Sequence, residues 1–150
     1  DILYRGEIIR SLMESQHDIT LVCDTAWRDR YRNRTEHPES DGEKIAAEGD
    51  RIIAVNRTME NEVALGEYIG LARFTPKGAK VLRMAFHQRK FKGNGGRFQE
   101  AKIFKKSYLI DLYQEMIDKG TALFLLETEG GYMEIDTNQD FMVAKKDWSP

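Results

Sequence analysis

The chain has 150 residues, a length that suits one domain with a core large enough to need no disulfide or metal for stability. Apolar residues make up 41% and charged residues 32%, which argues against disorder, and no apolar stretch approaches the roughly 20 residues that span a bilayer. The net charge of −2 argues against a general binder of nucleic acid or membranes. The single Cys23 leaves no intrachain disulfide, so we expect a cytoplasmic protein.

The first part of the chain alternates between expected strands and helices. Residues 1–4 predict the end of a strand. A short helix follows, with an apolar stripe at helical spacing made of Ile8, Ile9, Leu12 and Met13. Residues 19–23 are a continuous apolar run rich in β-branched side chains, typical of a strand buried on both faces. Residues 24–42 are polar and rich in turn formers, which indicates a loop over a surface or a site.

The middle of the chain predicts an antiparallel hairpin. Residues 43–48 and 51–56 flank a Gly-Asp pair, which is a good turn signal between two strands. Residues 66–74 predict another strand. Thr75 and Pro76 then open a helix in the expected order, an N-cap followed by proline at the first helical position.

The last third predicts a long helix, a second buried strand and a short final helix. Residues 108–117 carry apolar side chains on one helical face, and Gly120 ends that helix. Residues 122–127 predict the buried strand. Two glycines then turn the chain into residues 132–136, and Thr137 caps the final helix.

These elements predict the α/β class. We expect a mixed sheet with helices on its faces and a β-hairpin that protrudes to one side. The sequence has no internal repeat and no linker that would divide it, so residues 1–150 form a single domain.

Four short segments resemble the sugar-phosphate and phosphocholine nucleotidyltransferase superfamily. They are residues 1–4 (Asp-Ile-Leu-Tyr), 43–44 (Glu-Lys), 105–111 (Lys-Lys-Ser-Tyr-Leu-Ile-Asp) and 134–137 (Glu-Ile-Asp-Thr). The stretches 24–44 and 66–70 (Gly-Glu-Tyr-Ile-Gly) narrow the resemblance to cytidylyltransferase-like domains of the type fused to phosphoenolpyruvate phosphomutase in phosphonate and surface-glycan biosynthesis. The resemblance covers nearly the whole chain, and its segments are collinear.

The resemblance implies a Rossmann-like nucleotidyltransferase fold, but the glycine-rich loop that holds the nucleotide in such proteins is missing here. The glycine cluster at residues 93–96 lies between expected helices rather than between a strand and a helix, so it does not fit a phosphate-binding loop. We therefore expect a partial domain that carries the metal and acceptor side. We expect that it is inactive alone and forms a homo-oligomer or associates with the missing N-terminal half.

The resemblance also implies a reaction. A nucleotidyl group, CMP from CTP, would pass to a phosphonate or phosphomonoester with release of pyrophosphate. Two aspartates hold Mg²⁺ in the family, one at the end of a central strand and one late in the chain, and Asp1 and Asp136 match those positions. The residue-level alternatives are a frayed terminus for Asp1 and a strand-end carboxylate near a cap for Asp136.

Glu43 and Lys44 match the pair that faces the acceptor in the family. The attacking oxygen is anionic and needs no strong general base, so the catalytic role expected of Lys44 is to orient that oxygen. The alternative is an exposed charge pair on a strand. Asp111 is a polar position on an apolar helix and is expected to orient substrate or a loop.

An arginine-aromatic cluster suggests how a zwitterionic acceptor would bind. Trp27 and Tyr31 lie one helical turn apart and could stack on an ammonium group. The flanking side chains expected to bind the phosphonate and amine are Asp24, Arg28 and Arg34, and the family pattern adds Glu67 and Tyr68. A solvated charged loop anchored by one tryptophan explains the same residues.

Three other functions remain open from the sequence. The acceptor could be a sugar 1-phosphate, the cluster could bind nucleic acid, or the chain could be a non-catalytic assembly module. Net acidity counts against nucleic acid. The three histidines show no metal-ligand spacing and give no further signal.

Overall fold

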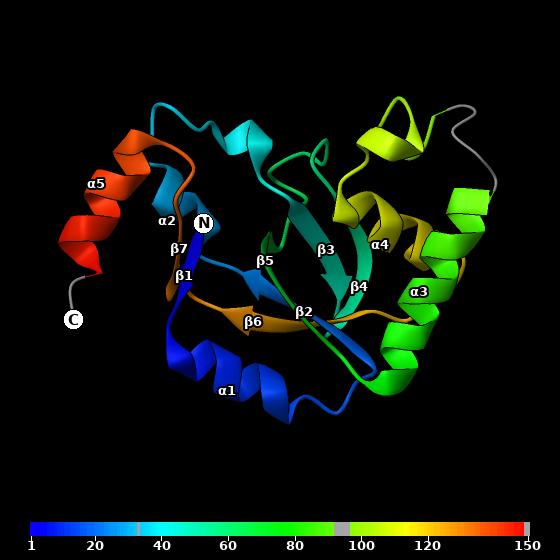
Figure 1. The fold of residues 1–150 in the computed structure, drawn as a ribbon. Coiled ribbons are helices and arrows are strands. Elements are labelled where there is room, and N and C mark those ends of the chain that lie inside the picture. The colour runs from blue at the N-terminus through cyan, green and yellow to red at the C-terminus, as the bar shows by residue number, and fades with distance from the viewer. Residues whose placement is uncertain (33, 92–96, 149–150) are drawn as a thin grey trace.

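The fold is built around a five-stranded mixed sheet (Figure 1). The structure is a computed structural model, and it describes residues 1–32, 34–91 and 97–148. The strands close into a barrel in the order β2-β5-β3-β4-β6. Their bounds are β2 Ile19–Asp24, β5 Gly66–Phe74, β3 Lys44–Glu48, β4 Arg51–Asn56 and β6 Phe124–Thr128. The β2–β6 pair is parallel and the other pairs are antiparallel, so the expected mixed sheet is confirmed.

A second, two-stranded sheet lies beside the barrel. It pairs β1 (Ile2–Tyr4) with β7 (Tyr132–Glu134), so the start of the chain lies against a segment more than 100 residues later. This pairing carries residues 134–136 away from the barrel core and toward the loop that follows β2 (Figure 1).

Five α-helices and two short 3-10 turns complete the described part of the chain. They are α1 Gly6–Glu14, α2 Trp27–Tyr31, α3 Pro76–Phe91, α4 Leu109–Asp118 and α5 Asn138–Asp147, with η1 Glu39–Asp41 and η2 Phe104–Lys106. The local signals for their ends hold. The Thr75 hydroxyl accepts from the Gly78 amide at 3.1 Å, Thr137 accepts from the Asp140 amide at 3.1 Å, and Gly120 adopts a φ of +84° after α4.

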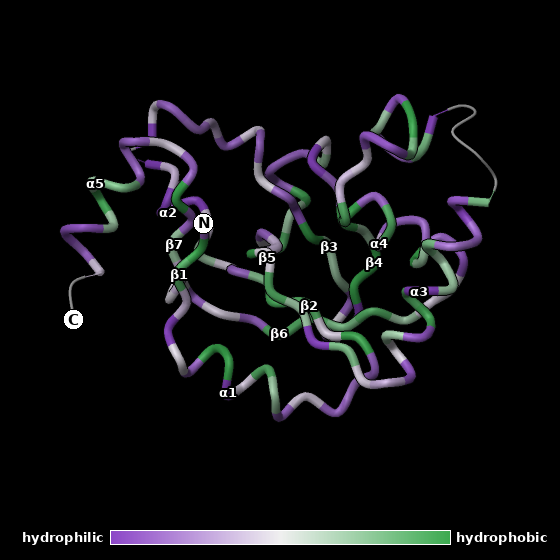
Figure 2. The backbone as a smooth tube through the Cα atoms, viewed as in Figure 1, coloured by the Kyte–Doolittle hydropathy of each residue, from purple (hydrophilic) through white to green (hydrophobic). Residues whose placement is uncertain are grey.

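The main core lies inside the barrel and beneath α3 and α4. Ile19 and Leu21 of β2 meet Ile45 of β3, Val55 of β4 and Tyr113 of α4 there. A smaller cluster between α1 and the outer face of β2 explains why every residue of β2 is buried. Figure 2 shows hydrophobic residues mainly along the strands and hydrophilic residues mainly in the loops.

The prediction that the β3–β4 hairpin protrudes is wrong. β3 pairs with β5 and β4 pairs with β6, so both strands belong to the barrel. The physical reason is the burial of Ile45, Ile52 and Val55, which an isolated hairpin would expose. The Rossmann-like arrangement and the missing nucleotide-loop half stay predictions, and the glycine cluster at 93–96 lies outside the described residues.

Within the described residues, no helix combines the length and the apolar character that crossing a membrane requires.

Candidate functional site

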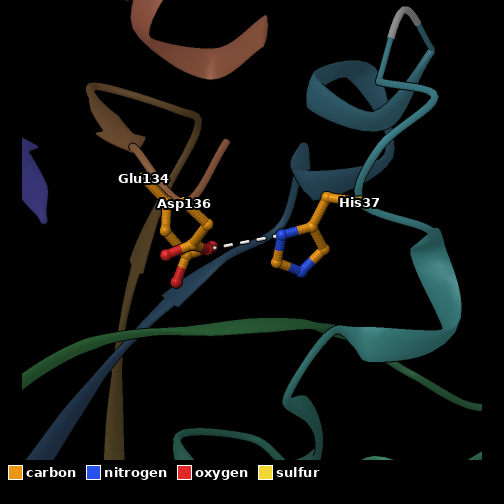
Figure 3. A group of neighbouring side chains, drawn as sticks. All are labelled: His37, Glu134 and Asp136. Carbon is orange, nitrogen blue, oxygen red and sulfur yellow. Dashed lines mark ion pairs between the residues drawn. The ribbon is translucent and has the colours of Figure 1, made fainter. Parts of the chain in front are cut away.

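Three potential metal ligands converge at the end of β7. His37, Glu134 and Asp136 each offer a ligand atom, and these atoms lie within 4.8 Å of one another. Glu134 ends β7 and Asp136 follows two residues later, a spacing that places both carboxylates on one side of an extended chain. His37 reaches them from the loop before η1, as Figure 3 shows. We call these three residues the cation group.

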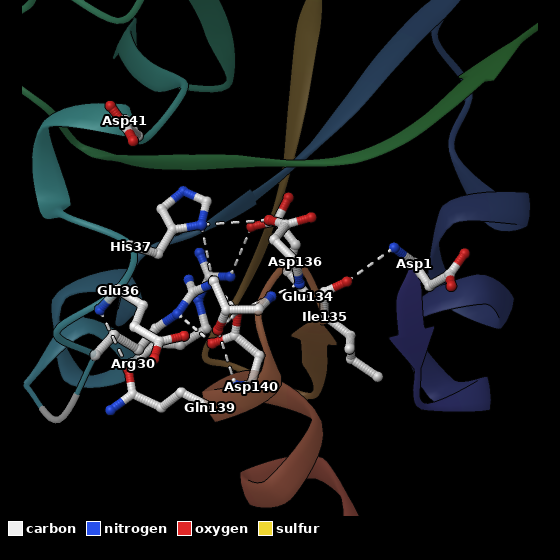
Figure 4. A network of polar contacts seen from close by, with 12 residues as sticks. Asp1, Arg30, Glu36, His37, Asp41, Glu134, Ile135, Asp136, Gln139 and Asp140 are labelled. Carbon is white, nitrogen blue, oxygen red and sulfur yellow. Dashed lines mark hydrogen bonds and ion pairs between the residues drawn. The ribbon is translucent and has the colours of Figure 1, made fainter.

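A buried arginine–aspartate pair supports this group. The Arg34 guanidinium donates to Asp140 from Nε at 2.8 Å and from Nη2 at 2.9 Å. Its Nη2 also lies 3.2 Å from His37 Nδ1, and the same Nδ1 lies 3.3 Å from Asp136 Oδ2. Burial raises the pKa of Asp140, but hydrogen bonds from Arg34 and Thr137 outweigh it and bring the pKa down to about 2. Figure 4 shows this network.

A second buried network lies behind Glu134. Arg30 forms ion pairs with Glu67 and, at 3.2 Å, with Glu134. Glu67 also accepts from the hydroxyls of Tyr31 at 2.5 Å and Tyr132 at 3.0 Å. Burial raises the pKa of Glu67, and the nearby Arg30 guanidinium opposes that rise. Arg30, itself held by the buried Glu67, therefore positions the Glu134 carboxylate from the side of the protein interior.

Lys44 is a buried cation at the start of β3. Its side chain is almost fully buried, and its Nζ donates to the Arg57 carbonyl at 2.8 Å. Among residues 1–32, 34–91 and 97–148, no carboxylate forms an ion pair with it. An open pocket of ≈ 740 Å³ adjoins this lysine. Its lining carries two cations, Lys44 and Arg57, and three carboxylates, those of Glu39, Glu60 and Glu62. A buried cation beside a pocket, without a counter-ion, suits an anionic ligand.

Glu43 precedes Lys44 in the chain, and its carboxyl group is influenced by Arg57, which lines the pocket, and by Glu134 of the cation group. Burial, together with the charges of Glu134 and Glu67, raises its pKa to about 7 against the opposing effect of Arg57. Its carboxyl group can therefore exchange a proton near neutral pH.

The structure places the two predicted metal ligands differently from the expectation. The Asp1 backbone pairs with Ile135, whose amide donates to the Asp1 carbonyl at 2.7 Å. The two segments thus meet, but Figure 4 shows the Asp1 carboxylate directed away from that of Asp136. Asp136 belongs to the cation group and Asp1 does not. A metal role for Asp1 stays a prediction that this geometry does not support.

Several predicted acceptor ligands instead stabilise the fold, which corrects the expectation for them. Trp27 is completely buried, and its ring packs edge-on against Tyr31 at 5.8 Å. Tyr68 is a core residue packed against Tyr113 at 5.8 Å. Both rings are buried in the core, so neither is open to a ligand. Burial of a large aromatic ring is favourable because it removes apolar surface from water.

The buried acids Asp24 and Asp111 bind backbone amides. Asp24 accepts from Ala26 at 3.0 Å and from Gly130 at 2.8 Å, so it joins the end of β2 to the turn before β7. Asp111 accepts from Tyr108 at 2.8 Å and from Glu100 at 3.1 Å, so it caps α4 and orients a loop, which was one of its two expected roles.

The predicted arginines and Tyr31 are also engaged within the chain. Arg34 is paired with Asp140, while the half-exposed Arg28 donates to the Asn61 carbonyl. Tyr31 donates its hydroxyl to Glu67 in a buried contact, so two residues that were each expected to bind the acceptor bind each other.

Sequence reasoning missed His37, Glu134, Arg30 and Asp140. The alternation of Glu134 and Asp136 is a usable signal for two carboxylates on one face. His37 gives no such signal, since its partners are 97 and 99 positions later in the chain.

Comparisons with known proteins agree with this fold. A scan against models of known protein families finds no match. The chain is 23% identical over 145 residues to CTP:phosphoglutamine cytidylyltransferase of Campylobacter jejuni, covering 95% of this chain and 55% of that protein. It shares its fold with the inositol-1-phosphate CTP transferase from T. maritima, with a TM-score of 0.59 and 14% identity over 93% of this chain and 48% of that one.

The chain is thus similar to cytidylyltransferases along nearly its whole length and spans about half the length of these relatives. A fusion to phosphoenolpyruvate phosphomutase stays a prediction.

Proposed function

We propose that the chain is the metal- and acceptor-binding part of a cytidylyltransferase. In the proposed reaction, an anionic oxygen of a phosphonate or phosphomonoester attacks the α-phosphorus of CTP. The bond to the β-phosphate bridging oxygen breaks and pyrophosphate leaves. The product is a CMP-linked acceptor. Both similar proteins carry names that describe CTP-dependent transfer, which supports the choice of nucleotide.

The observation that carries this proposal is the buried Lys44, whose ammonium group lines an open pocket. An unpaired ammonium group in a nearly dry position is costly, and a phosphate or phosphonate in the adjoining pocket would compensate it. The segment from His37 to Lys44 connects the cation group to the pocket in sequence. Within it, the pKa of Glu43 is influenced by Glu134 and by Arg57.

Each residue would have a distinct task. Lys44 would orient the attacking oxygen, which is already anionic and needs no general base. Arg57 would add positive charge at the pocket. The carboxylates of the cation group are chemically suited to a divalent cation, with Mg²⁺ as the ion expected from the sequence. When bound, such an ion would neutralise charge on the phosphoryl oxygens.

The test is pyrophosphate release from CTP. The described ranges contain no glycine-rich loop between a strand and a helix, so residues 1–150 should be assayed both alone and joined to a nucleotide-binding segment. Acceptors should include phosphoglutamine, inositol 1-phosphate, a sugar 1-phosphate and an aminoalkylphosphonate. We expect release with the joined protein and none with residues 1–150 alone. Absence of release with every acceptor would favour the non-catalytic assembly module.

A further inference from the structure

We propose that His37, Glu134 and Asp136 bind a divalent first-row transition ion, such as Mn²⁺, Co²⁺ or Zn²⁺, in preference to Mg²⁺. This deepens the proposed function, on which its catalytic meaning rests. The ligand set consists of one imidazole nitrogen and two carboxylates whose ligand atoms lie within 4.8 Å of one another (Figure 3). Imidazole suits Zn²⁺ and the later first-row ions, whereas Mg²⁺ favours an all-oxygen octahedron.

The charges around the cation group leave a deficit of two positive charges. Arg34 is paired with Asp140, and Arg30 is paired with Glu67. Arg30 also contacts Glu134 at 3.2 Å, so these two arginines face four carboxylates, those of Glu67, Asp140, Glu134 and Asp136. A divalent ion is the ligand that matches this charge, because nearby carboxylates repel one another without a cation between them.

The contacts of His37 Nδ1 point to the same conclusion. One nitrogen lies 3.2 Å from Arg34 Nη2, a donor, and 3.3 Å from Asp136 Oδ2, an acceptor. A neutral imidazole nitrogen either carries a proton or offers a lone pair, so it cannot satisfy both neighbours. If a metal ion were bound, His37 and Asp136 could each donate a lone pair to it. Arg34 would keep its two hydrogen bonds to Asp140.

The ligands are also held from behind, as metal ligands usually are. Arg30 fixes Glu134 at 3.2 Å, and the Asp136 amide donates to Asp140 Oδ2 at 3.2 Å. Asp140 therefore positions both Arg34 and the backbone of Asp136. Three protein ligands would leave coordination positions open for phosphate oxygens or water.

The experiment is a titration of residues 1–150 with CoCl₂ in the absence of CTP and acceptor, followed by visible absorption. We expect saturable absorption bands that a large excess of MgCl₂ does not remove. His37→Asp replaces the ligand nitrogen with oxygen and should weaken Co²⁺ binding by at least roughly 100-fold, since loss of a supporting partner alone costs a metal site about 10- to 100-fold. His87→Asp is the matched control, because His87 is exposed on α3, and it should leave binding unchanged.

Asp1→Asn separates this site from the pair expected from the sequence. If Co²⁺ binding is lost in Asp1→Asn and kept in His37→Asp, the proposal is wrong and the aspartate pair holds the ion. Equal Co²⁺ affinity in His37→Asp and the unchanged chain would also overturn it.

A second measurement needs no variant. In the chain labelled with ¹⁵N-histidine, Zn²⁺ should shift the Nδ1 resonance of one of the three histidines, and Mg²⁺ should not. No shift with Zn²⁺ would refute the site. CTP is absent from both experiments. A negative result would therefore refute the proposed preference for a transition ion, and the transfer reaction would still be tested separately by pyrophosphate release.

Discussion

Lys44 is the buried cation that we propose to bind the acceptor. Its ammonium group is nearly fully buried, with a backbone carbonyl as its hydrogen-bond acceptor. Lys44→Met keeps the length of the side chain and removes the charge. We expect the free energy of unfolding to stay equal or rise by about 1 kcal/mol, while the KM for the acceptor rises steeply. Urea denaturation and acceptor kinetics measure the two effects.

Lys80→Met is the control for Lys44, because Lys80 is exposed on α3. It should change neither quantity. If Lys44→Met destabilises the protein and leaves the acceptor KM unchanged, then Lys44 has a structural role only.

The raised pKa of Glu43 should make the stability of the protein depend on pH. Its pKa rises from 4.5 to about 7 on folding, so the folded state holds a proton that the unfolded state has lost between these values. The free energy of unfolding should therefore fall between about pH 4.5 and pH 7 and then level off. Partial exposure of the carboxyl limits this contribution to on the order of 2 kcal/mol.

Glu43→Gln removes the titrating group and keeps the shape. The difference between the two unfolding curves over this pH range isolates the contribution of Glu43. Parallel curves would show that its carboxyl group has an ordinary pKa.

Residue types alone suggested part of the site. Asp136 belongs to the cation group and Lys44 lines a pocket, while the roles of Glu43, Lys44 and Asp136 in substrate or metal binding stay predictions. Trp27 and Tyr68 were misassigned, because a sequence does not reveal whether an aromatic ring faces a pocket or the core. The same limit applies to Arg34, whose partner Asp140 is 106 residues away.

At the scale of elements, α5 links its own cap to the site. Thr137 and Asp140 form a capping box, and Asp140 also neutralises the buried Arg34. Thr137→Ala should cost about 1 kcal/mol of stability, the usual value of an N-cap. Asp140→Asn should cost about 3 to 5 kcal/mol, because it leaves Arg34 buried without a counter-ion.

Chemical denaturation of both variants measures this difference. The double variant Arg34→Met with Asp140→Asn should recover much of the loss, since it removes the isolated charge. Equal costs for the two single variants would mean that the ion pair adds nothing beyond the cap.

Replacing Gly78 of helix α3 by alanine should destabilise the protein, although helix propensity alone favours alanine. Alanine at an interior helical position is favoured by about 1 kcal/mol over glycine. A Cβ at Gly78, however, would lie 2.0 Å from the Asp18 carbonyl oxygen. We therefore expect Gly78→Ala to lower the melting temperature, with a net loss of about 2 kcal/mol.

The matched control is Gly6→Ala at the start of α1, where the nearest atom is the end of the Arg10 side chain at 3.5 Å. This variant should melt at the same temperature as the unchanged chain or slightly above it. Stabilisation by Gly78→Ala would show that α3 can move away from the loop before β2.

At the scale of the whole molecule, most elements follow from local signals. Caps, turn residues and apolar periodicity predicted the strands β2, β5 and β6 and the helices α3 and α4 within a few residues. Closure of the barrel was not predictable in this way, because it depends on β4 meeting β6 at Arg51 and Phe124, residues far apart in sequence. The hairpin was therefore assigned to the wrong place, although its two strands were identified.

We propose that the Lys44 pocket and the cation group form one active site. The most direct test is the relaxation of the ³¹P signal of a bound phosphomonoester when Mn²⁺ is added to the protein. We predict strong broadening that disappears in Lys44→Met, which removes acceptor binding, and in Asp136→Asn, which removes a ligand of the ion. Broadening that persists unchanged in both variants would show that the ion and the phosphate bind elsewhere, and would rule out a shared active site.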